Sequence, residues 1–515
     1  MIKKLYLIFF IILLSLGLIL LFNMISETGY IQFSDGAKFA DIGRNILNGK
    51  GYTSNFSFYN LATLNIDEFV DISRWVPPVM PLVIAGFFKI FGILDLSVIA
   101  TSSFFYLLLV LTSYLLGKRF FGNLAGLLAG MAVAFNPNFL EYATSGASET
   151  LFAFEIVLAA YLIVLRKKPA NIAAFLVLML MYFTKVQAII YISGLVFLFL
   201  LINFSLKRAL GYFSAIFILG LALFLVVSKQ GLFAITQHLP GVASSDALRG
   251  AVQEVTISGL FKKVFYNIYN FYRLLPEIAS PYMWTLFVVG LFKWGKDRAE
   301  NSLKIATIFM VTLTFLVTAL TIPLFRYLHP VIPLVYLFAV ATLVWIVGQI
   351  VKDRKKIAII SSVLIFLFVV GQTLGVIFLD SRFKAKTVNK GKPPVYVVLS
   401  KILNENTDPE NVIVTNLDTW GSWYGERRTV WYPLKPEQLD LKDTQNPFDA
   451  IFLTSYLMDD ENYYMGSEWR QIFENPKSPK DEFVAKNYKF VGEFKVSADE
   501  NYEKQEGRAI LLVRK

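Results

Sequence analysis

The fold is decided by two apolar stretches on either side of residue 351. VIPLVYLFAVATLVWIVGQI (331–350) is followed by VKDRKK (351–356) and then by IAIISSVLIFLFVVGQTLGVIFL (357–379). A helix needs about 20 apolar residues to cross the hydrocarbon core of a bilayer, and it satisfies its own backbone hydrogen bonds there. These residues therefore predict two membrane-spanning helices joined by a basic turn.

Nine further apolar runs extend this pattern along the chain. The first follows two lysines, as in a signal peptide, but the small residues of a cleavage site are absent, so we interpret it as an uncleaved anchor. A shorter run at 79–91 carries a lysine and follows two prolines, which favours an amphipathic helix in the outer membrane interface. The eleven predicted spans are 5–24, 97–117, 123–138, 150–164, 171–183, 188–204, 209–227, 281–292, 305–320, 331–350 and 357–379.

The basic residues test this assignment. With a cytoplasmic amino terminus, six segments should face the cytoplasm, and all six are basic, as the positive-inside rule requires. They hold 17 of the 49 Lys and Arg residues and three of the 38 acidic residues, which leaves 32 basic and 35 acidic residues elsewhere. The formal net charge of +11 therefore reflects membrane topology and predicts no nucleic-acid partner. The six segments are 3–4, 118–119, 166–168, 207–208, 293–304 and 352–356.

The composition changes after residue 380. Residues 1–380 form the predicted transmembrane module, in which 25–96 make one long outer loop. Residues 381–515 mix short β-rich runs with helix-like stretches, as a soluble α/β domain does. The predicted fold class is a polytopic α-helical membrane protein of about 11 spans with a C-terminal extracytoplasmic α/β domain. The β-rich runs are 411–415, 450–453, 489–496 and 509–513.

Two acidic residues begin predicted outer helices. Asp35 precedes a helical period of apolar residues that ends near Gly49, and Glu149 lies where a span begins. Both fit acids that stabilise a helix amino terminus. Both also fit carboxylates held at the membrane surface as a general base or a metal ligand. On this second interpretation the two acids form a catalytic pair.

The sequence leaves metal dependence open. The chain has no cysteine, which excludes iron–sulfur clusters, zinc–thiolate sites and disulfides. Asp67, Glu68 and Asp71 form another acidic cluster in the first outer loop, and a solvated loop is the simpler interpretation of it. No cofactor is predicted with certainty, and a divalent metal stays an open alternative.

Basic side chains gather on the same side of the predicted membrane. Arg74 precedes a Pro-Pro turn, Lys185 ends one span, and Arg326 and His329 lie together before another span. Each fits a residue whose charged end reaches the interface from a membrane helix. A cluster of cations at headgroup depth also suits a lipid phosphate, to which Arg offers two parallel hydrogen bonds.

Together these motifs resemble the GT-C superfamily of membrane glycosyltransferases, in particular the bacterial group similar to protein O-mannosyltransferases and the aminoarabinose lipid A transferase (glycosyltransferase family 39). The resemblance covers nearly the whole chain, because the many spans and the C-terminal domain also agree. It is carried by the order and sidedness of ILNGKGY (46–52), RWVPPVMP (74–81), SGASETL (145–151) and RYLHP (326–330).

The resemblance implies an inverting transfer of a sugar from a polyprenyl-phosphate carrier to an acceptor on the outer face, which is a lipid, a glycan or a protein. It implies that Asp35 is the catalytic base and that Glu149 positions the substrate or a metal. Arg326, with Arg74, Lys185 and His329, would hold the donor phosphate.

The chain departs from the metal-dependent oligosaccharyltransferases of this superfamily, which carry paired acids in the first loop and a Trp-Trp-Asp signature. Asp35 has no acid two positions away, and WGSWYG (420–425) lacks the aspartate. We therefore do not expect sequon-specific oligosaccharide transfer.

The main alternative is a polytopic transporter or flippase of lipid-linked or small polar substrates. Transporters typically carry repeats and polar groups within their spans, whereas this chain shows no repeat and its charges lie at the outer ends. A purely structural membrane protein leaves Asp35 and Glu149 unexplained. The expected location is the bacterial or archaeal plasma membrane, with surrounding lipids as partners and the C-terminal domain outside.

Overall fold

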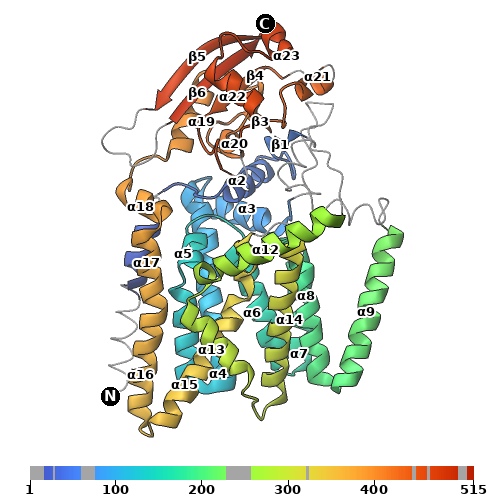
Figure 1. The fold of residues 1–515 in the computed structure, drawn as a ribbon, viewed down its shortest axis with the longest axis vertical. Helices are drawn as coiled ribbons and strands as arrows, with labels where there is room; N and C mark the ends of the chain where they lie inside the picture. The colour runs from blue at the N-terminus through green and yellow to red at the C-terminus, as the bar shows by residue number, and fades with distance from the viewer. Residues whose placement is uncertain are drawn as a thin grey trace.

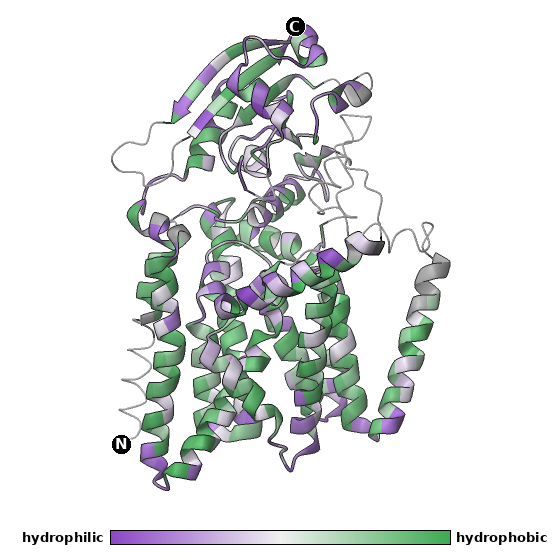
Figure 2. Ribbon diagram, in the orientation of Figure 1, coloured by the Kyte–Doolittle hydropathy of each residue, from purple (hydrophilic) through white to green (hydrophobic). Residues whose placement is uncertain are grey.

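The computed structural model of the protein is mainly helical. It describes residues 15, 17–26, 29–59, 76–227, 257–320, 324–443, 448–460, 464–496 and 507–515. Long helices run side by side in a bundle, and a β-sheet with short helices covers one end of it (Figure 1). Figure 2 shows that the bundle is mostly hydrophobic between its two ends, as expected for helices packed among lipids.

The described helices of the bundle have bounds close to ten of the predicted spans, whereas most of the first predicted span, 5–24, lies outside the described residues. A short π-helical turn at Phe366–Val370 interrupts the last long helix. The helices are α4 (Asp95–Ala134), α5 (Pro137–Ala143), α6 (Glu149–Val164), α7 (Lys168–Thr184), α8 (Ala188–Asn203), α9 (Leu206–Val227), α12 (Ile257–Ile278), α13 (Pro281–Leu291), α14 (Arg298–Leu320), η3 (Phe325–Tyr327), η4 (His329–Val331), α15 (Ile332–Ile350), α16 (Arg354–Ile365), α17 (Gly371–Leu379) and α18 (Ser381–Val388).

Length and apolar composition single out fewer membrane-crossing helices than the sequence predicted. Among the described residues four helices qualify, or five if α12 and α13, which are bent by 104°, form one broken span. Several predicted spans are shorter: α6 and α8 have 16 residues each and α13 has 11. The count of eleven spans therefore remains a prediction. The four helices are Asp95–Ala134, Arg298–Leu320, His329–Ile350 and Arg354–Leu379.

The longest helix, α4, folds back on itself. Gly122 has φ +84°, a conformation that glycine adopts without strain, and the helical backbone breaks there. The hydroxyl of Tyr106 donates to the carbonyl of Ala134 at 2.6 Å, which brings residues 28 positions apart side by side. The two parts of α4 are therefore antiparallel, and they match the predicted spans 97–117 and 123–138.

Two helices of the first loop, α2 (Ser34–Leu47) and α3 (Val79–Phe91), lie between the bundle and the sheet (Figure 1). The amphipathic helix predicted at 79–91 is α3, with the same bounds. Because α2 packs on α3 and on α20 (Trp420–Trp423) of the C-terminal region, it joins both parts of the molecule.

The sheet has six strands in the order β1-β3-β2-β4-β6-β5. The four strands β1, β3, β2 and β4 are parallel, and β6 and β5 add antiparallel strands. The four predicted β-rich runs coincide with β2, β4, β5 and β6, whereas β1 and β3 were not predicted. The strands are β1 (Phe56–Phe58), β2 (Val412–Thr415), β3 (Arg428–Trp431), β4 (Ala450–Thr454), β5 (Tyr488–Val496) and β6 (Gly507–Arg514).

Five helices complete the C-terminal region, and they are α19 (Val395–Glu405), α20 (Trp420–Trp423), α21 (Gln438–Asp443), α22 (Ser467–Glu474) and α23 (Glu482–Asn487). The division of the chain at residue 380 stays a prediction. Strand β1 belongs to the first loop, before residue 380, yet it pairs with β3 at the edge of the C-terminal sheet. The turns between α8 and α9, between α13 and α14, and between α15 and α16 lie at the end of the bundle opposite the sheet (Figure 1). Three of the six segments predicted to be cytoplasmic, 207–208, 293–304 and 352–356, lie in these turns or in the first residues of the helices that follow them.

Candidate active site at the start of α2

The first turn of α2 lies against the loop that precedes α6. A methyl group on Gly36 would clash with the backbone carbonyl oxygen of Ser145, so only glycine permits this approach. Asp35 is the residue before Gly36, and Glu149 begins α6 four residues after Ser145. The close packing of the two segments therefore brings the two predicted acids to the same place.

Arg326 lies between these acids. Its Nη1 donates to Oδ2 of Asp35 at 3.0 Å and is 4.0 Å from Oε1 of Glu149. Lys185, at the end of α7, places its Nζ 2.5 Å from the same Glu149 oxygen, and Lys38 reaches Oδ1 of Asp35 at 3.3 Å. Arg326 thus connects the two acids, and their action as a catalytic pair stays a prediction.

The site carries three cations and two carboxylates. The side chain of Glu149 is 2% exposed and that of Lys185 14%, whereas Asp35 and Arg326 keep 27% and 31% of their surface. One positive charge is therefore in excess in a largely desolvated site, where charge–charge interactions are stronger than in water. Such a site favours a ligand that carries negative charge.

Two polar atoms of the site are buried and have no hydrogen-bond partner among the described residues. They are Oε2 of Glu149 and Nε of Arg326. Buried polar atoms are nearly always paired, so an unpaired donor on the guanidinium needs an explanation. An anionic group placed against Arg326 would supply one.

The surroundings of Asp35 keep it ionised. Burial alone would raise the pKa of this carboxyl, but attraction to Lys38, Arg326 and Lys185 outweighs burial and holds the pKa well below its usual range.

The described residues of the site do not form a ligand set for a divalent cation, and metal dependence of the whole chain stays open. Among the described parts of the chain, no group of three or more His, Asp or Glu side chains gathers as metal ligands would. Asp35 and Glu149 each already face cations, and a divalent ion would add charge to a site with an excess of positive charge. The other acidic cluster, Asp67, Glu68 and Asp71, lies outside the described residues.

His329, predicted to bind the donor phosphate, lies in η4 and is buried. Its Nδ1 is 2.5 Å from the hydroxyl of Tyr142, and its ring packs on Phe139. These contacts tie the segment that carries Arg326 to α5. Direct contact between His329 and a phosphate stays a prediction, and Arg74 lies outside the described residues.

Sequence reasoning missed Lys38 and an ion pair formed by Glu141 and Lys386. Lys38 follows Asp35 by three positions, a spacing that puts both on one helical face, so the signal was present. Nζ of Lys386 is 2.9 Å from Oε1 of Glu141, and both residues are buried. The 245 positions between them leave no local signal.

Comparison with known proteins agrees with this architecture. A family model described as dolichyl-phosphate-mannose-protein mannosyltransferase matches residues 76–230. The fold matches the apo structure of ArnT from Cupriavidus metallidurans with a TM-score of 0.50, at 13% identity over 98% of this chain and 97% of that chain. No curated protein matches the chain.

A second match is the oligosaccharyltransferase AglB from Archaeoglobus fulgidus, in a complex with an inhibitory peptide and a dolichol-phosphate. Its TM-score is 0.52, at 12% identity over 94% of this chain and 73% of that chain. An Archaeoglobus fulgidus oligosaccharyltransferase in complex with Zn and sulfate gives a TM-score of 0.53, at 14% identity over 91% of this chain and 68% of that chain. The family match and the shared fold confirm the resemblance to GT-C membrane glycosyltransferases. Together with the apolar helices of the chain they support an integral membrane protein.

Proposed function

On the premise that this chain resembles the GT-C membrane glycosyltransferases in sequence and fold, we propose that it is an inverting glycosyltransferase. It transfers a sugar from a polyprenyl-phosphate donor to an acceptor on the outer face of the membrane. The observation that carries the proposal is the position of Arg326 between Asp35 and Glu149, with a buried, unpaired Nε and an excess of cations around it.

The proposed reaction is a single displacement at the anomeric carbon of the donor sugar. An acceptor hydroxyl oxygen attacks this carbon and forms the new glycosidic bond, while the bond from the carbon to the phosphate oxygen breaks. The electron pair of that bond goes to the lipid phosphate, and Asp35 accepts the proton of the acceptor. One displacement inverts the configuration at the sugar carbon.

Arg326 and Lys185 stabilise the charge that develops on the leaving phosphate. Hydrogen bonds between ionised groups are roughly twice as strong as neutral ones, and a guanidinium matches phosphate geometry. Cations fixed in place before the reaction lower the barrier because they do not have to reorganise when charge develops. Glu149 binds Lys185 and lies close to Arg326, so its proposed role is to orient both cations.

Donor binding also prepares Asp35 to act as a base. A carboxylate paired with Arg326 and Lys38 is a weak base, because both cations stabilise its ionised form. A phosphate bound to Arg326 competes for the guanidinium and adds negative charge nearby. Both effects return the pKa of Asp35 toward its ordinary value, so the base strengthens when the donor is in place.

The proposed outer location rests on the distribution of basic residues. The turns between α13 and α14 and between α15 and α16 lie at the end of the bundle opposite the sheet (Figure 1). They carry lysines, and the helices that follow them begin with Arg298 and Arg354. By the positive-inside rule, that end faces the cytoplasm. Asp35 and the C-terminal region then lie on the extracytoplasmic side of a bacterial or archaeal plasma membrane.

The test is transfer by the purified protein in lipid nanodiscs. The protein is given a panel of radiolabelled polyprenyl-phosphate sugars together with a membrane extract that supplies acceptors. Asp35→Asn should reduce transfer about 100-fold or more, as loss of a general base does. Asp440→Asn, the same change at an exposed position in α21, should transfer like the native protein.

Equal transfer by Asp35→Asn and native protein would contradict the role given to Asp35. If no carrier in the panel supports transfer, and the protein instead moves the labelled lipid between leaflets, the glycosyltransferase proposal is wrong and the flippase alternative holds.

A further inference from the structure

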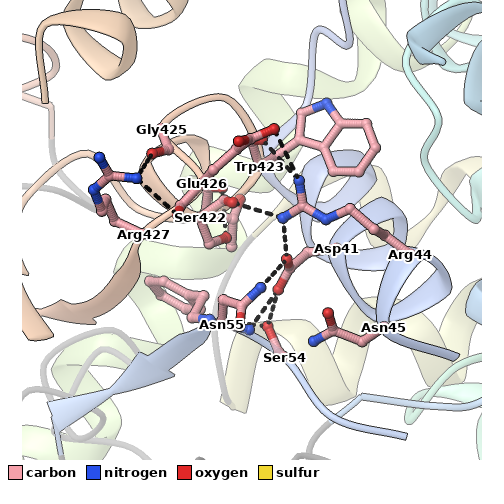
Figure 3. A network of polar contacts seen from close by, with 12 residues as sticks. Asp41, Arg44, Asn45, Ser54, Asn55, Ser422, Trp423, Gly425, Glu426 and Arg427 are labelled. Carbon is pink, nitrogen blue, oxygen red and sulfur yellow. Dashed lines mark hydrogen bonds and ion pairs between the residues drawn. The ribbon is translucent and has the colours of Figure 1, made fainter. Parts of the chain in front are cut away.

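The helix that carries Asp35 is fastened to the C-terminal region at Arg44, between two and three turns further along α2 (Figure 3). Nη2 of Arg44 donates to the carbonyl of Ser422 at 2.8 Å, and Nη1 donates to that of Trp423 at 3.3 Å. The guanidinium also lies over the Trp423 ring, 4.8 Å from its centroid. One side chain of α2 thus makes three contacts with α20.

Asp41 holds the Arg44 side chain in place. It is fully buried and accepts from Nη2 of Arg44 at 2.7 Å. It also accepts from the Ser54 hydroxyl at 2.7 Å, and from the backbone and side-chain nitrogens of Asn55 at 2.6 Å and 3.0 Å (Figure 3). Asn55 immediately precedes β1, so Asp41 connects α2 to the edge of the C-terminal sheet.

The same C-terminal segment also contacts the chain on the other side of Asp35. The Thr419 hydroxyl donates to the carbonyl of Ser34 at 2.6 Å. Nε1 of Trp423 donates to Oδ1 of Asp95 at 2.7 Å, which ties the segment to the start of α4 in the bundle. Residues 419–423 therefore hold α2 at its first residue and at Arg44, and they fix it relative to the bundle.

We propose that Arg44, Asp41 and Trp423 are positioning residues for the transfer reaction. They hold the tilt and rotation of α2, so that the Asp35 carboxylate faces the acceptor while the donor phosphate lies on Arg326. This inference rests on the proposed function. Among the contacts of the described residues, none joins Arg44 to Arg326 or Glu149. The effect of Arg44 on Asp35 therefore passes through α2.

The geometry distinguishes positioning from donor binding. A displacement of about 1 Å in a reacting group can reduce the rate about 100-fold even when the substrate still binds. Loss of the Arg44 contacts should therefore lower kcat and leave the KM for the donor nearly unchanged, because Arg326 and Lys185 keep their places.

The experiment compares Arg44→Ala, Arg44→Lys and Trp423→Phe with the native protein in the transfer assay. Arg44→Ala should lower kcat at least tenfold with a donor KM within twofold of the native value, and millimolar methylguanidinium should restore part of the rate. Arg44→Lys should have a kcat between those of Arg44→Ala and the native protein, because an ammonium keeps the ion pair with Asp41 but lacks the planar fork of hydrogen-bond donors. Glu426→Gln, at an exposed residue 4.0 Å from Arg44, is the matched control and should match the native protein.

A second measurement reports the position of α2 without activity. Because the chain has no cysteine, spin labels can be placed selectively by Asn48→Cys and Ile172→Cys, which lie on exposed positions after α2 and on α7. The distance distribution between them should broaden or shift in Arg44→Ala. If Arg44→Ala does not fold, the same two measurements are made on Trp423→Phe, which removes the donor to Asp95 and leaves a smaller ring under the Arg44 guanidinium.

An unchanged distance distribution, or a donor KM that rises while kcat stays constant, would overturn the positioning role. Failure of the proposed function would give a different result: the native protein itself would transfer no sugar, or Asp35→Asn would transfer as well as the native protein.

Discussion

Arg326 donates to the carboxylate of Asp35 at 3.0 Å, although 291 positions separate the two residues in the chain. The pair joins the helix of the first loop to the short segment before α15. We expect a bound phosphate to compete with Asp35 for this guanidinium, and the first prediction tests that competition.

Arg326→Ala should raise the donor KM and lower kcat, because the guanidinium contacts the phosphate before and during bond breaking. The loss in kcat/KM should be about 100-fold or more, which is the loss expected when one hydrogen-bond donor to a developing anion is removed. Arg326→Lys should recover only part of it, since a single ammonium does not form two parallel bonds. A polyprenyl monophosphate should raise the thermal unfolding midpoint of the native protein but not that of Arg326→Ala. Equal shifts in both proteins would place the phosphate elsewhere.

Asp35→Asn should change the pH dependence of stability. The pKa of Asp35 is lower in the folded protein than in the unfolded chain, so its ionised form stabilises the fold above the unfolded value of about 4. That contribution is lost as the pH falls through the folded pKa. The difference in unfolding midpoint between native protein and Asp35→Asn should thus be largest near neutral pH and shrink in acid. A difference that stays constant between pH 7 and pH 3 would contradict the charge interactions described for this carboxylate.

Gly36→Ala should reduce transfer without unfolding the protein. The added methyl group clashes with the Ser145 carbonyl, which moves the first turn of α2 and Asp35 with it. We expect a loss in kcat of at least tenfold. Gly86→Ala is the control, since Gly86 lies within α3 with open space around it, and there Ala favours the helix by about 1 kcal/mol. Full activity of Gly36→Ala would show that the contact between α2 and the loop before α6 is not required.

Lys386→Met should destabilise the protein by leaving Glu141 buried without this cation. Breaking a buried ion pair on one side typically costs about 3–5 kcal/mol, whereas replacing both partners is often nearly neutral. The double variant Glu141→Gln with Lys386→Met should therefore unfold at a higher temperature than Lys386→Met alone. The measurement is thermal unfolding in detergent, followed by tryptophan fluorescence. A double variant less stable than either single one would contradict the expected coupling.

The sequence predicted which residues of the site share one side of the membrane, because hydropathy and the distribution of Lys and Arg are local signals. Asp35, Glu149, Lys185 and Arg326 do converge. Their connections were not predictable: nothing in the sequence indicated that Arg326 would lie between the two acids. Such contacts between distant segments depend on how helices pack, and one sequence contains no direct record of that.

The strand β1 shows a second limit. Phe56–Phe58 is only three residues long and is buried throughout, so it lacks the alternation of polar and apolar residues that marks a half-buried strand. The longer strands β5 and β6 were predictable because their length and their β-branched and aromatic residues favour a strand. The predicted boundary at residue 380 missed that the first loop contributes to the sheet.

The bond from Arg44 to the carbonyl of Ser422 also has a consequence for biosynthesis. The two residues are 378 positions apart, so a ribosome that adds 5–20 residues per second needs roughly 20–80 s to make the second after the first. During that interval the nascent helix with Asp35 has no C-terminal partner. A chain released early would carry every proposed catalytic side chain and still lack the contacts that hold the base in place. The proposed enzyme would therefore reach full activity only after translation of the C-terminal region is complete.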